Sequence, residues 1–164
     1  MQELELEKTS EQEDTLQGKY LTFSLGERDL YGMDIRYVTE IIGMKPITQV
    51  PEMPEYMKGI MNLRGKIIPI MDVRKRFGRE EKAYDERTCI IVLNTDDFSI
   101  GLIVDRVDEV LTIQDEEISP LPDLKKGDHG YIKGIGKTEG RITLLLDCKK
   151  VLNGDELVEV NLQE

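Results

Sequence analysis

One block of twenty residues occurs twice in this chain. Residues 59–78 read GIMNLRGKIIPIMDVRKRFG, and residues 134–153 read GIGKTEGRITLLLDCKKVLN, and the two align without a gap. They share a pair of glycines, an apolar run, and an aspartate followed by basic residues. An internal repeat of this kind predicts two similar units packed together, because one short unit cannot bury its hydrophobic face alone.

A hairpin pattern precedes each block and also recurs. Tyr20–Leu25 and Cys89–Asn94 are mostly apolar, and each is followed by turn residues and a second apolar run, as in a β-hairpin. The alignment continues into a short segment of the form V-x-E. Its paired residues are Gly32 with Gly101, Val38 with Val107, and Glu40 with Glu109.

Three aspartates predict where short helices begin. Asp72 and Asp147 each end an apolar run and precede a helical stretch, at residues 73–77 and 148–152. Asp34 can cap a short helix over Ile35–Ile42. The alternative is a continuing strand, because the Tyr, Val, Thr and Ile residues there favour β structure.

Short apolar runs separated by Gly, Asn and Asp turns are typical of all-β barrels and sandwiches. The repeat favours two small barrels that share hydrophobic surface, since each alone has a marginal core. Pro69 lacks a backbone N–H, so its strand should be bulged or lie at an edge. We expect Asp115–Gly130 to be a mobile loop, and Asp155–Asn161 can form a terminal helix.

The first seventeen residues differ from the rest. Residues 1–17 are acidic and lack aromatic side chains, so we predict a disordered N-terminal tail. The Leu4/Leu6 alternation is too short to predict a strand. Order should begin near Lys19, and residues 18–164 should form one domain of two pseudo-repeated barrel subdomains.

Charge and composition restrict the classes of partner. The chain has a net charge of -11, and an acidic surface repels phosphate, so we expect no nucleic-acid partner. No apolar run approaches the ~20 residues that span a bilayer, so no direct membrane insertion is expected. Cys89 and Cys148 adjoin apolar runs, as reduced, buried thiols do in a cytoplasmic protein.

No pattern predicts a catalytic centre, and none predicts a metal or cofactor site. The single histidine, His129, lies in a glycine-bounded loop without a second ligand nearby. Asp72 and Asp147 could be imagined as paired carboxylates, but each is better explained as a helix cap. The GIGKT at 134–138 lacks the first glycine of a phosphate-binding loop and precedes a strand. A binding module is therefore favoured.

The two blocks differ most at their predicted bends. The first reads Asn62-Leu63-Arg64 before its second glycine, and the second reads Lys137-Thr138-Glu139. An exposed arginine at a turn usually contributes little to stability. However, a purely structural bend could have been alike in both copies, and here the charge reverses. We therefore expect Arg64 to have a binding role.

The long first block resembles the CheW family, the coupling proteins of bacterial chemotaxis. The matching run, VPEMPEYMKGIMNLRGKIIPIMDVRKRFG at 50–78, is similar to the family pattern V-P-x-x-P, G-x-x-N-L-R-G, an apolar strand with proline, and D-[LV]-R-x-x-F-G. Supporting matches are YLTFSLGERDLYGMDIRYVTEI at 20–41 and SIGLIVDRVDEVL at 99–111. The resemblance extends over about residues 19–153.

The resemblance implies a mainly β fold, with two intertwined five-stranded SH3-like β-barrels and short helices. It also implies a non-catalytic adaptor between the cytoplasmic tip of methyl-accepting chemotaxis receptors and the regulatory domain of the histidine kinase CheA. The positions that match the family's receptor-binding residues are Val38, Glu40, Asn62, Leu63 and Arg64. Lys58 and Gly59 match a region tied to kinase binding or assembly.

Three alternatives remain open from the sequence. One is a CheW-like scaffold of another receptor–kinase array, for example one that controls surface motility or development. Another is a ring-forming structural component that does not contact receptors. The third is a small enzyme that uses Asp72, Asp147 and His129.

Overall fold

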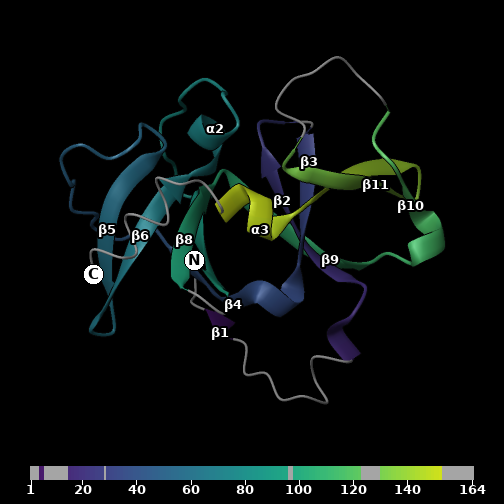
Figure 1. The fold of residues 1–164 in the computed structure, drawn as a ribbon, viewed down its shortest axis with the longest axis horizontal. Coiled ribbons are helices and arrows are strands. Elements are labelled where there is room, and N and C mark those ends of the chain that lie inside the picture. Colours follow the sequence, from purple (N-terminus) through teal and green to yellow (C-terminus); the bar gives the residue numbers. More distant parts are fainter. Residues whose placement is uncertain (1–3, 6–14, 28, 96–97, 123–129, 153–164) are drawn as a thin grey trace.

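Two six-stranded β-sheets dominate the structure, a computed structural model that describes residues 4–5, 15–27, 29–95, 98–122 and 130–152 (Figure 1). In spatial order, the first sheet contains β1 (Leu4–Glu5), β4 (Val38–Gly43), β7 (Cys89–Asn94), β8 (Ser99–Val104), β6 (Lys66–Asp72) and β5 (Met57–Leu63). The second contains β10 (Ile118–Ser119), β11 (Ile132–Thr138), β12 (Arg141–Leu146), β3 (Asp29–Asp34), β2 (Lys19–Leu25) and β9 (Arg106–Thr112). The short helices are η1 (Ile35–Tyr37), α2 (Val73–Arg76), η2 (Asp115–Glu117) and α3 (Cys148–Leu152).

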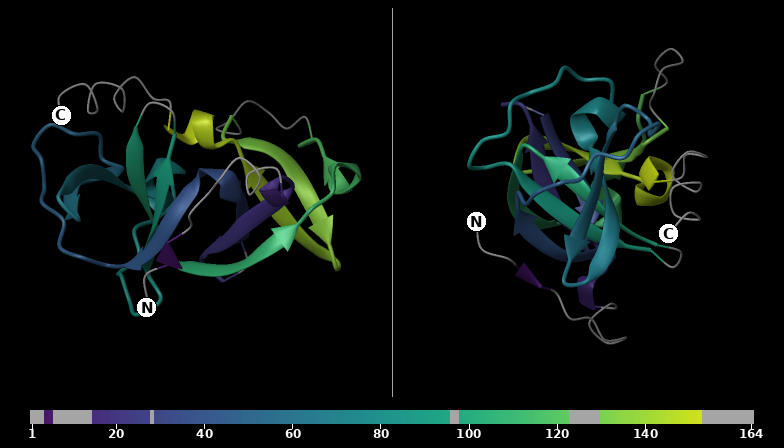
Figure 2. Two further views of the ribbon diagram at one scale, coloured as in Figure 1. Left: turned by 90° about the horizontal axis from the view of Figure 1, so that it is seen from below. Right: turned by 90° about the vertical axis from the view of Figure 1, so that its left-hand side faces the viewer.

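Each sheet takes strands from both halves of the chain. The β7–β8 hairpin of the second half lies between β4 and β6 of the first half. In the same way, the β2–β3 hairpin of the first half lies between β9 and β12 of the second half. Figure 2 shows the two sheets side by side with α3 next to their junction. The halves are therefore intertwined, and neither sheet is complete without the other half.

Two equivalent glycines allow the hairpin of each half to pack between strands of the other half. Gly101 of β8 pairs in parallel with Ile70 of β6, and Gly32 of β3 pairs with Leu145 of β12. A Cβ atom at Gly101 would lie 2.7 Å from Ile70 Cδ1, and one at Gly32 would lie 3.1 Å from Leu145 Cδ2. The absence of a side chain lets the apolar residue of the partner strand occupy this space.

The hydrophobic core confirms that the two units share buried surface. Its largest cluster draws on both sheets and both halves, including Phe23, Val38, Ile91 and Leu146. A second cluster lies within the first sheet, around Ile68 and Ile90, and a small third one lies within the second sheet around Tyr20, Ile113 and Leu145. The common core fixes the two sheets to each other.

Most of the predicted local structure is confirmed, with two corrections in the first half. The helix predicted over Ile35–Ile42 is only the single turn η1, because Val38 returns to extended backbone and pairs with Leu93 of β7. The strand with Pro69 is not an edge strand: β6 lies between β5 and β8. Its ladder with β8 begins at Ile70, so Pro69 adjoins that ladder without entering it.

The tail contains a strand that the sequence did not predict. Leu4 and Glu5 form β1, which pairs in an antiparallel manner with Ile41 and Glu40 of β4. The disorder predicted for the other tail residues concerns mainly positions 1–3 and 6–14, which lie outside the described residues. The terminal helix predicted at 155–161 and residues 123–129 of the predicted loop also lie outside the described residues. The start of that loop is regular structure instead, because it forms η2 and β10. Within the part of the chain that the structure describes, no helix is both long and apolar enough to span a membrane.

Candidate partner-binding site

The β5–β6 hairpin ends in the two-residue turn Arg64-Gly65. Both residues have positive φ values, 52° for Arg64 and 87° for Gly65. Two-residue hairpin turns with this backbone match the twist of the strands, although a positive φ is uncommon for residues other than glycine. The Asn62 side chain supports the turn, since its Oδ1 accepts a hydrogen bond of 2.8 Å from the Gly65 N–H.

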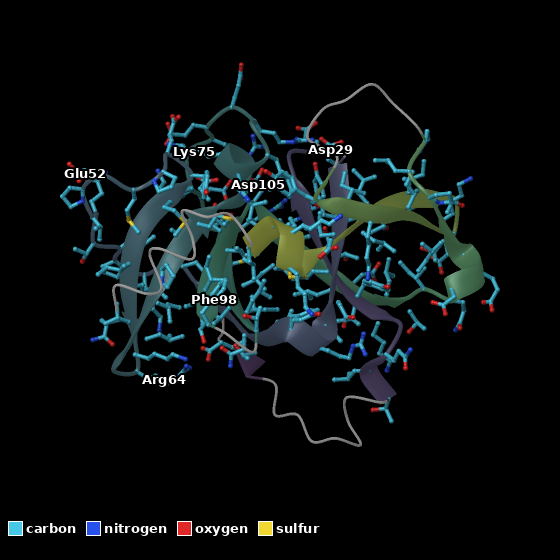
Figure 3. The ribbon with its side chains drawn as sticks, viewed as in Figure 1. Asp29, Glu52, Arg64, Lys75, Phe98 and Asp105 are labelled. Carbon is cyan, nitrogen blue, oxygen red and sulfur yellow. The ribbon has the colours of Figure 1, made fainter. Side chains whose placement is uncertain are left out.

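Arg64 forms an ion pair with Glu40 of β4 at this hairpin end. Its Nη1 lies 2.7 Å from both carboxylate oxygens of Glu40. The Glu40 side chain is only 11% exposed, whereas the Arg64 side chain is 46% exposed. A nearly buried carboxylate needs a cationic partner, and a charge-assisted contact of this length is among the stronger hydrogen bonds in proteins. Figure 3 shows Arg64 at the tip of the hairpin.

The predicted receptor residues divide into surface and core positions. Asn62 and Arg64 are exposed at the tip, and Glu40 lies beneath Arg64. Val38 and Leu63, in contrast, are buried in the hydrophobic core. The structure therefore brings Glu40, Asn62 and Arg64 together, and it leaves Val38 and Leu63 only a supporting position beneath the surface.

Lys58 and Gly59 lie at the opposite end of β5. Gly59 has a φ of 143° at a register shift, and a Cβ atom there would lie 2.0 Å from the carbonyl oxygen of Thr48. The position therefore requires glycine. The Lys58 Nζ lies 3.3 Å from Glu81 and 5.5 Å from the centre of the Tyr84 ring. Lys58 and Gly59 thus lie at the opposite end of β5 from Asn62 and Leu63.

The corresponding turn of the second half has the same backbone and different chemistry. Glu139 and Gly140 have φ values of 52° and 75°. The residue equivalent to Glu40 is Glu109, whose side chain is 59% exposed and lies 4.0 Å from Arg141. The two V-x-E glutamates therefore differ in burial: Glu109 is exposed, and Glu40 is nearly buried beside Arg64.

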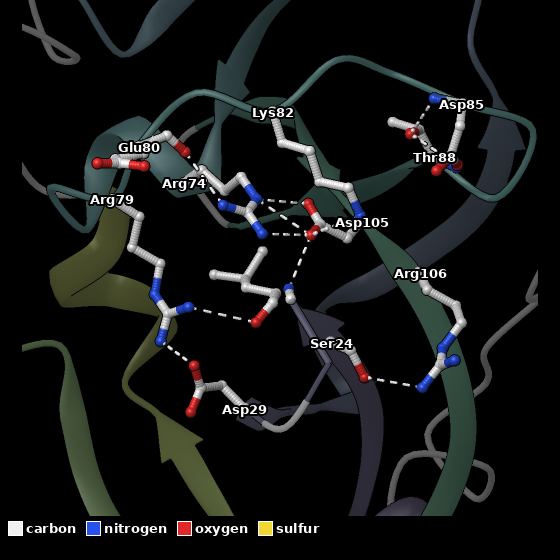
Figure 4. Close-up of polar contacts among 12 residues, drawn as sticks. Ser24, Asp29, Arg74, Arg79, Glu80, Lys82, Asp85, Thr88, Asp105 and Arg106 are labelled. Atoms are coloured by element: carbon white, nitrogen blue, oxygen red, sulfur yellow. Dashed lines mark hydrogen bonds and ion pairs between the residues drawn. The ribbon is translucent and has the colours of Figure 1, made fainter.

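A nearly buried ion pair, not anticipated from the sequence, joins the two halves. Arg74 of α2 donates to both carboxylate oxygens of Asp105, at 2.7 to 3.0 Å, and the Gly26 N–H donates to Asp105 at 2.7 Å (Figure 4). Burial favours the neutral acid, but these hydrogen bonds outweigh it and lower the pKa of Asp105. The only sequence signal was that neither residue recurs: Lys149 and Arg36 occupy the equivalent positions.

A second unanticipated contact is a guanidinium held between two aromatic rings. Arg76 lies 4.6 Å from the ring centre of Tyr56 and 4.8 Å from that of Tyr131. These tyrosines occupy equivalent positions, each three residues before its block. The Arg76 Nε also donates a 3.1 Å hydrogen bond to the carbonyl of Val151. Cation–π contacts of this geometry strengthen the junction between the halves.

Asp72 and Asp147, the aspartates considered for catalysis, have structural roles. Asp72 caps α2 by accepting from the Arg74 N–H at 3.0 Å, and it also accepts from the Tyr84 hydroxyl at 2.9 Å. Asp147 accepts from the Lys150 N–H at 3.2 Å. His129 lies outside the described residues. Among those that are described, no three His, Cys, Asp or Glu side chains cluster as metal ligands would.

The two cysteines are also unsuited to reactivity. Cys89 and Cys148 are both free and buried. Burial raises the pKa of Cys89 to about 11 and that of Cys148 to about 12. Both thiols are therefore neutral near pH 7, whereas a reactive cysteine needs its thiolate form. This agrees with the reduced, buried thiols expected from the sequence.

Comparison with known proteins agrees with the architecture. The family model of the CheW-like domain matches residues 19–156. The chemotaxis protein CheW of Klebsiella aerogenes is 37% identical over 149 residues, covering 90% of this chain and 89% of that protein. Its namesake in Treponema pallidum is 34% identical, covering 86% of this chain and 85% of that protein.

A solved structure shows the same fold. The crystal structure of the scaffolding protein TtCheW from Thermoanaerobacter tengcongensis superposes with a TM-score of 0.77 at 37% sequence identity. The match covers 85% of this chain and 94% of that one. With two intertwined β-sheets and this degree of similarity over most of its length, the chain belongs to the CheW family of chemotaxis coupling proteins.

Proposed function

We propose that this protein is a non-catalytic, cytoplasmic adaptor that couples chemotaxis receptors to the histidine kinase CheA. The observation that carries the proposal is the Arg64–Glu40 pair, which is short and nearly buries its glutamate, whereas at the other tip Glu109 lies 4.0 Å from Arg141 and both side chains are exposed. Relatives that are named chemotaxis proteins, and a related scaffolding protein of known structure, support the same role.

The geometry of the pair is suited to a receptor tip. Glu40 fixes the guanidinium of Arg64, and roughly half of the Arg64 side chain still faces solvent. An arginine whose position is already fixed loses less conformational entropy on binding than a mobile one. A helical hairpin with a carboxylate on its surface can dock there, since arginine pairs well with carboxylates. Val38 and Leu63 support this surface from below.

Replacing Arg64 tests the receptor contact. We expect Arg64→Ala to weaken binding of a receptor-tip fragment roughly tenfold, because a central charged contact is lost. Arg64→Glu should weaken it roughly a hundredfold, because a second carboxylate then lies beside Glu40. Calorimetric titration measures both affinities, and circular dichroism checks that each variant is folded.

Glu139→Ala is the matched control, because Glu139 has the same backbone conformation at the other hairpin tip. It should bind the receptor fragment like the parent. Receptor affinities that are equal for the parent, Arg64→Ala and Arg64→Glu would remove the proposal. If the same variants still bind the kinase regulatory domain, the protein is a structural component without receptor contact.

The kinase contact is assigned to the other end of β5. Gly59 is buried and supports the backbone bridge between Thr48 and Ile60, and Lys58 lies beside the Glu81 and Tyr84 side chains. We expect Lys58→Glu to weaken binding of the kinase regulatory domain at least fivefold and to leave receptor affinity unchanged. A loss of both activities would show that the two ends of the strand do not act separately.

A further inference from the structure

The outer edges of the two sheets differ. β4 pairs with β7 on one side and with the tail strand β1 on the other. Its equivalent in the other half, β9, pairs with β2, and no strand of the described residues lies on its second side. Ile41, opposite Leu4, is buried, whereas its equivalent Val110 is exposed. The tail therefore covers an edge that is open in the second sheet.

The covered edge adjoins the proposed receptor contact. Glu5 of β1 lies opposite Glu40, whose carboxylate is 2.7 Å from Arg64. Figure 1 and the left view of Figure 2 place β1 next to β4, at the edge of the first sheet. A partner that reaches across Arg64 and Glu40 therefore approaches the position of β1.

The tail also has the charge of a competitor for Arg64. Residues 1–17 contain six acidic residues and one lysine. A receptor segment that pairs with Arg64 must itself present a carboxylate. The tail and a receptor segment of this kind are both negatively charged, and their mutual repulsion disfavours simultaneous binding beside Arg64.

The pairing of β1 with β4 is short enough to break and re-form. β1 pairs with β4 at only two residue positions. The few hydrogen bonds of such a ladder contribute little net free energy, and the entropy lost by ordering the tail opposes them. Exposed sheet edges, in turn, readily pair with other segments. Because these free-energy contributions are small and opposed, we expect β1 to pair with β4 and dissociate from it repeatedly in solution.

We propose that Leu4–Glu5 is a displaceable strand that covers the β4 edge and competes with the receptor tip for the surface at Glu40 and Arg64. This inference rests on the proposed receptor function of that surface. The apparent affinity of a site is reduced by the fraction of molecules in which it is uncovered. A cover that is closed in most molecules therefore weakens receptor binding about threefold to tenfold.

A disulfide between β1 and β4 tests this directly. Leu4 and Ile41 lie opposite each other, and opposite residues of an antiparallel pair have Cα separations that suit a disulfide. The variant Leu4→Cys/Ile41→Cys locks the strand without changing Glu40 or Arg64. The native thiols, Cys89 and Cys148, are buried and should not interfere. Ile41→Cys alone controls for the lost packing.

We expect the oxidised double variant to bind a receptor-tip fragment at least tenfold more weakly than the same protein after reduction. A chain that lacks residues 1–8 should bind about threefold to tenfold more tightly than the full chain. Failure of the disulfide to form under oxidising conditions overturns the proposal. So does equal receptor affinity of the oxidised and reduced forms.

The Arg64→Glu variant distinguishes a failure of the displaceable strand from a failure of the proposed receptor contact, on which this inference rests. If Arg64→Glu abolishes binding while locking and deletion have no effect, the displaceable cover is wrong and the receptor contact stands. If Arg64→Glu binds the receptor like the parent in both the full and the shortened chain, the receptor contact and the cover are both wrong.

Discussion

The hairpin tips of the two halves have the same backbone and opposite charges. Arg64 and Glu139 share a φ of 52°, and each is followed by a glycine with positive φ. In the first half the arginine neutralises a nearly buried glutamate, and in the second half the equivalent glutamate is exposed. The shared turn is what the fold requires, and the ion pair is what distinguishes one tip from the other.

This difference shows which residues of a tip are needed for its backbone and which are specific to one half. Each half is a control for the other, because equivalent positions have similar backbone and different side chains. A position with the same contacts in both halves should be equally sensitive to substitution, and a position whose contacts differ should be sensitive mainly in one half.

The largest effect is expected at the first glycine of each block. A Cβ atom at Gly59 would lie 2.0 Å from a backbone carbonyl oxygen at a φ of 143°, so Gly59→Ala should lower the free energy of unfolding by about 4 kcal/mol. At Gly134 the closest atom, at 2.8 Å, belongs to the Ile118 side chain, which can move. Gly134→Ala should therefore cost about 1 kcal/mol. Chemical denaturation measures both, and equal losses would contradict the comparison.

An intermediate effect is expected at the first helix of each half. Arg74→Ala removes the closest ion-pair partner of Asp105, at a position where both side chains are less than 15% exposed, and leaves the more exposed Lys82 at 3.7 Å. It should lower the free energy of unfolding by about 3 kcal/mol. Lys149, the equivalent residue of α3, is exposed, so Lys149→Ala should change stability by less than about 0.5 kcal/mol.

The Arg74 effect should also depend on pH. The pKa of Asp105 is lowered in the folded protein, so its ion pair stabilises the fold above the unfolded pKa of about 3.9. This contribution is lost as the pH falls through the lower, folded pKa. The stability gap between the parent and Arg74→Ala should be constant near pH 7 and narrow below about pH 4. A gap that does not change in acid would show that Asp105 is not responsible.

The smallest effect is expected when the second tip is given the charge of the first. Glu139→Arg places an arginine at the equivalent turn, but Glu109 is exposed there and already lies near Arg141. We expect stability to change by less than about 0.5 kcal/mol and receptor affinity to remain within about twofold of the parent. Restoration of receptor binding in Arg64→Ala/Glu139→Arg would show that any arginine at a tip suffices.

Local structure could be predicted from the sequence because it depends on nearby residues. The turns at Arg64 and Glu139, the caps at Asp72 and Asp147, and both hairpins follow from glycine placement, capping chemistry and apolar alternation. The sharing of hydrophobic surface followed from the small size of each half. These features required no knowledge of distant contacts.

The remaining features depend on contacts between distant residues. Glu40 and Glu109 look alike in sequence, but in the folded chain Glu40 meets Arg64 and lies beside the β1 strand, whereas Glu109 stays exposed. The segment after Asp34 has both helical spacing and β-branched residues, and pairing with β7 decides in favour of the strand. The β1 strand forms because β4 offers it an edge, which the tail sequence alone does not reveal.

The central claim is that receptors bind the first hairpin tip and not the second. The most direct test is to titrate the isotopically labelled protein with an unlabelled receptor-tip fragment and follow its amide resonances. We predict that the resonances of Glu40, Asn62 and Arg64 shift, and that those of Lys137 and Glu139 do not. Equal shifts at both tips, or shifts only at the second, would contradict the account.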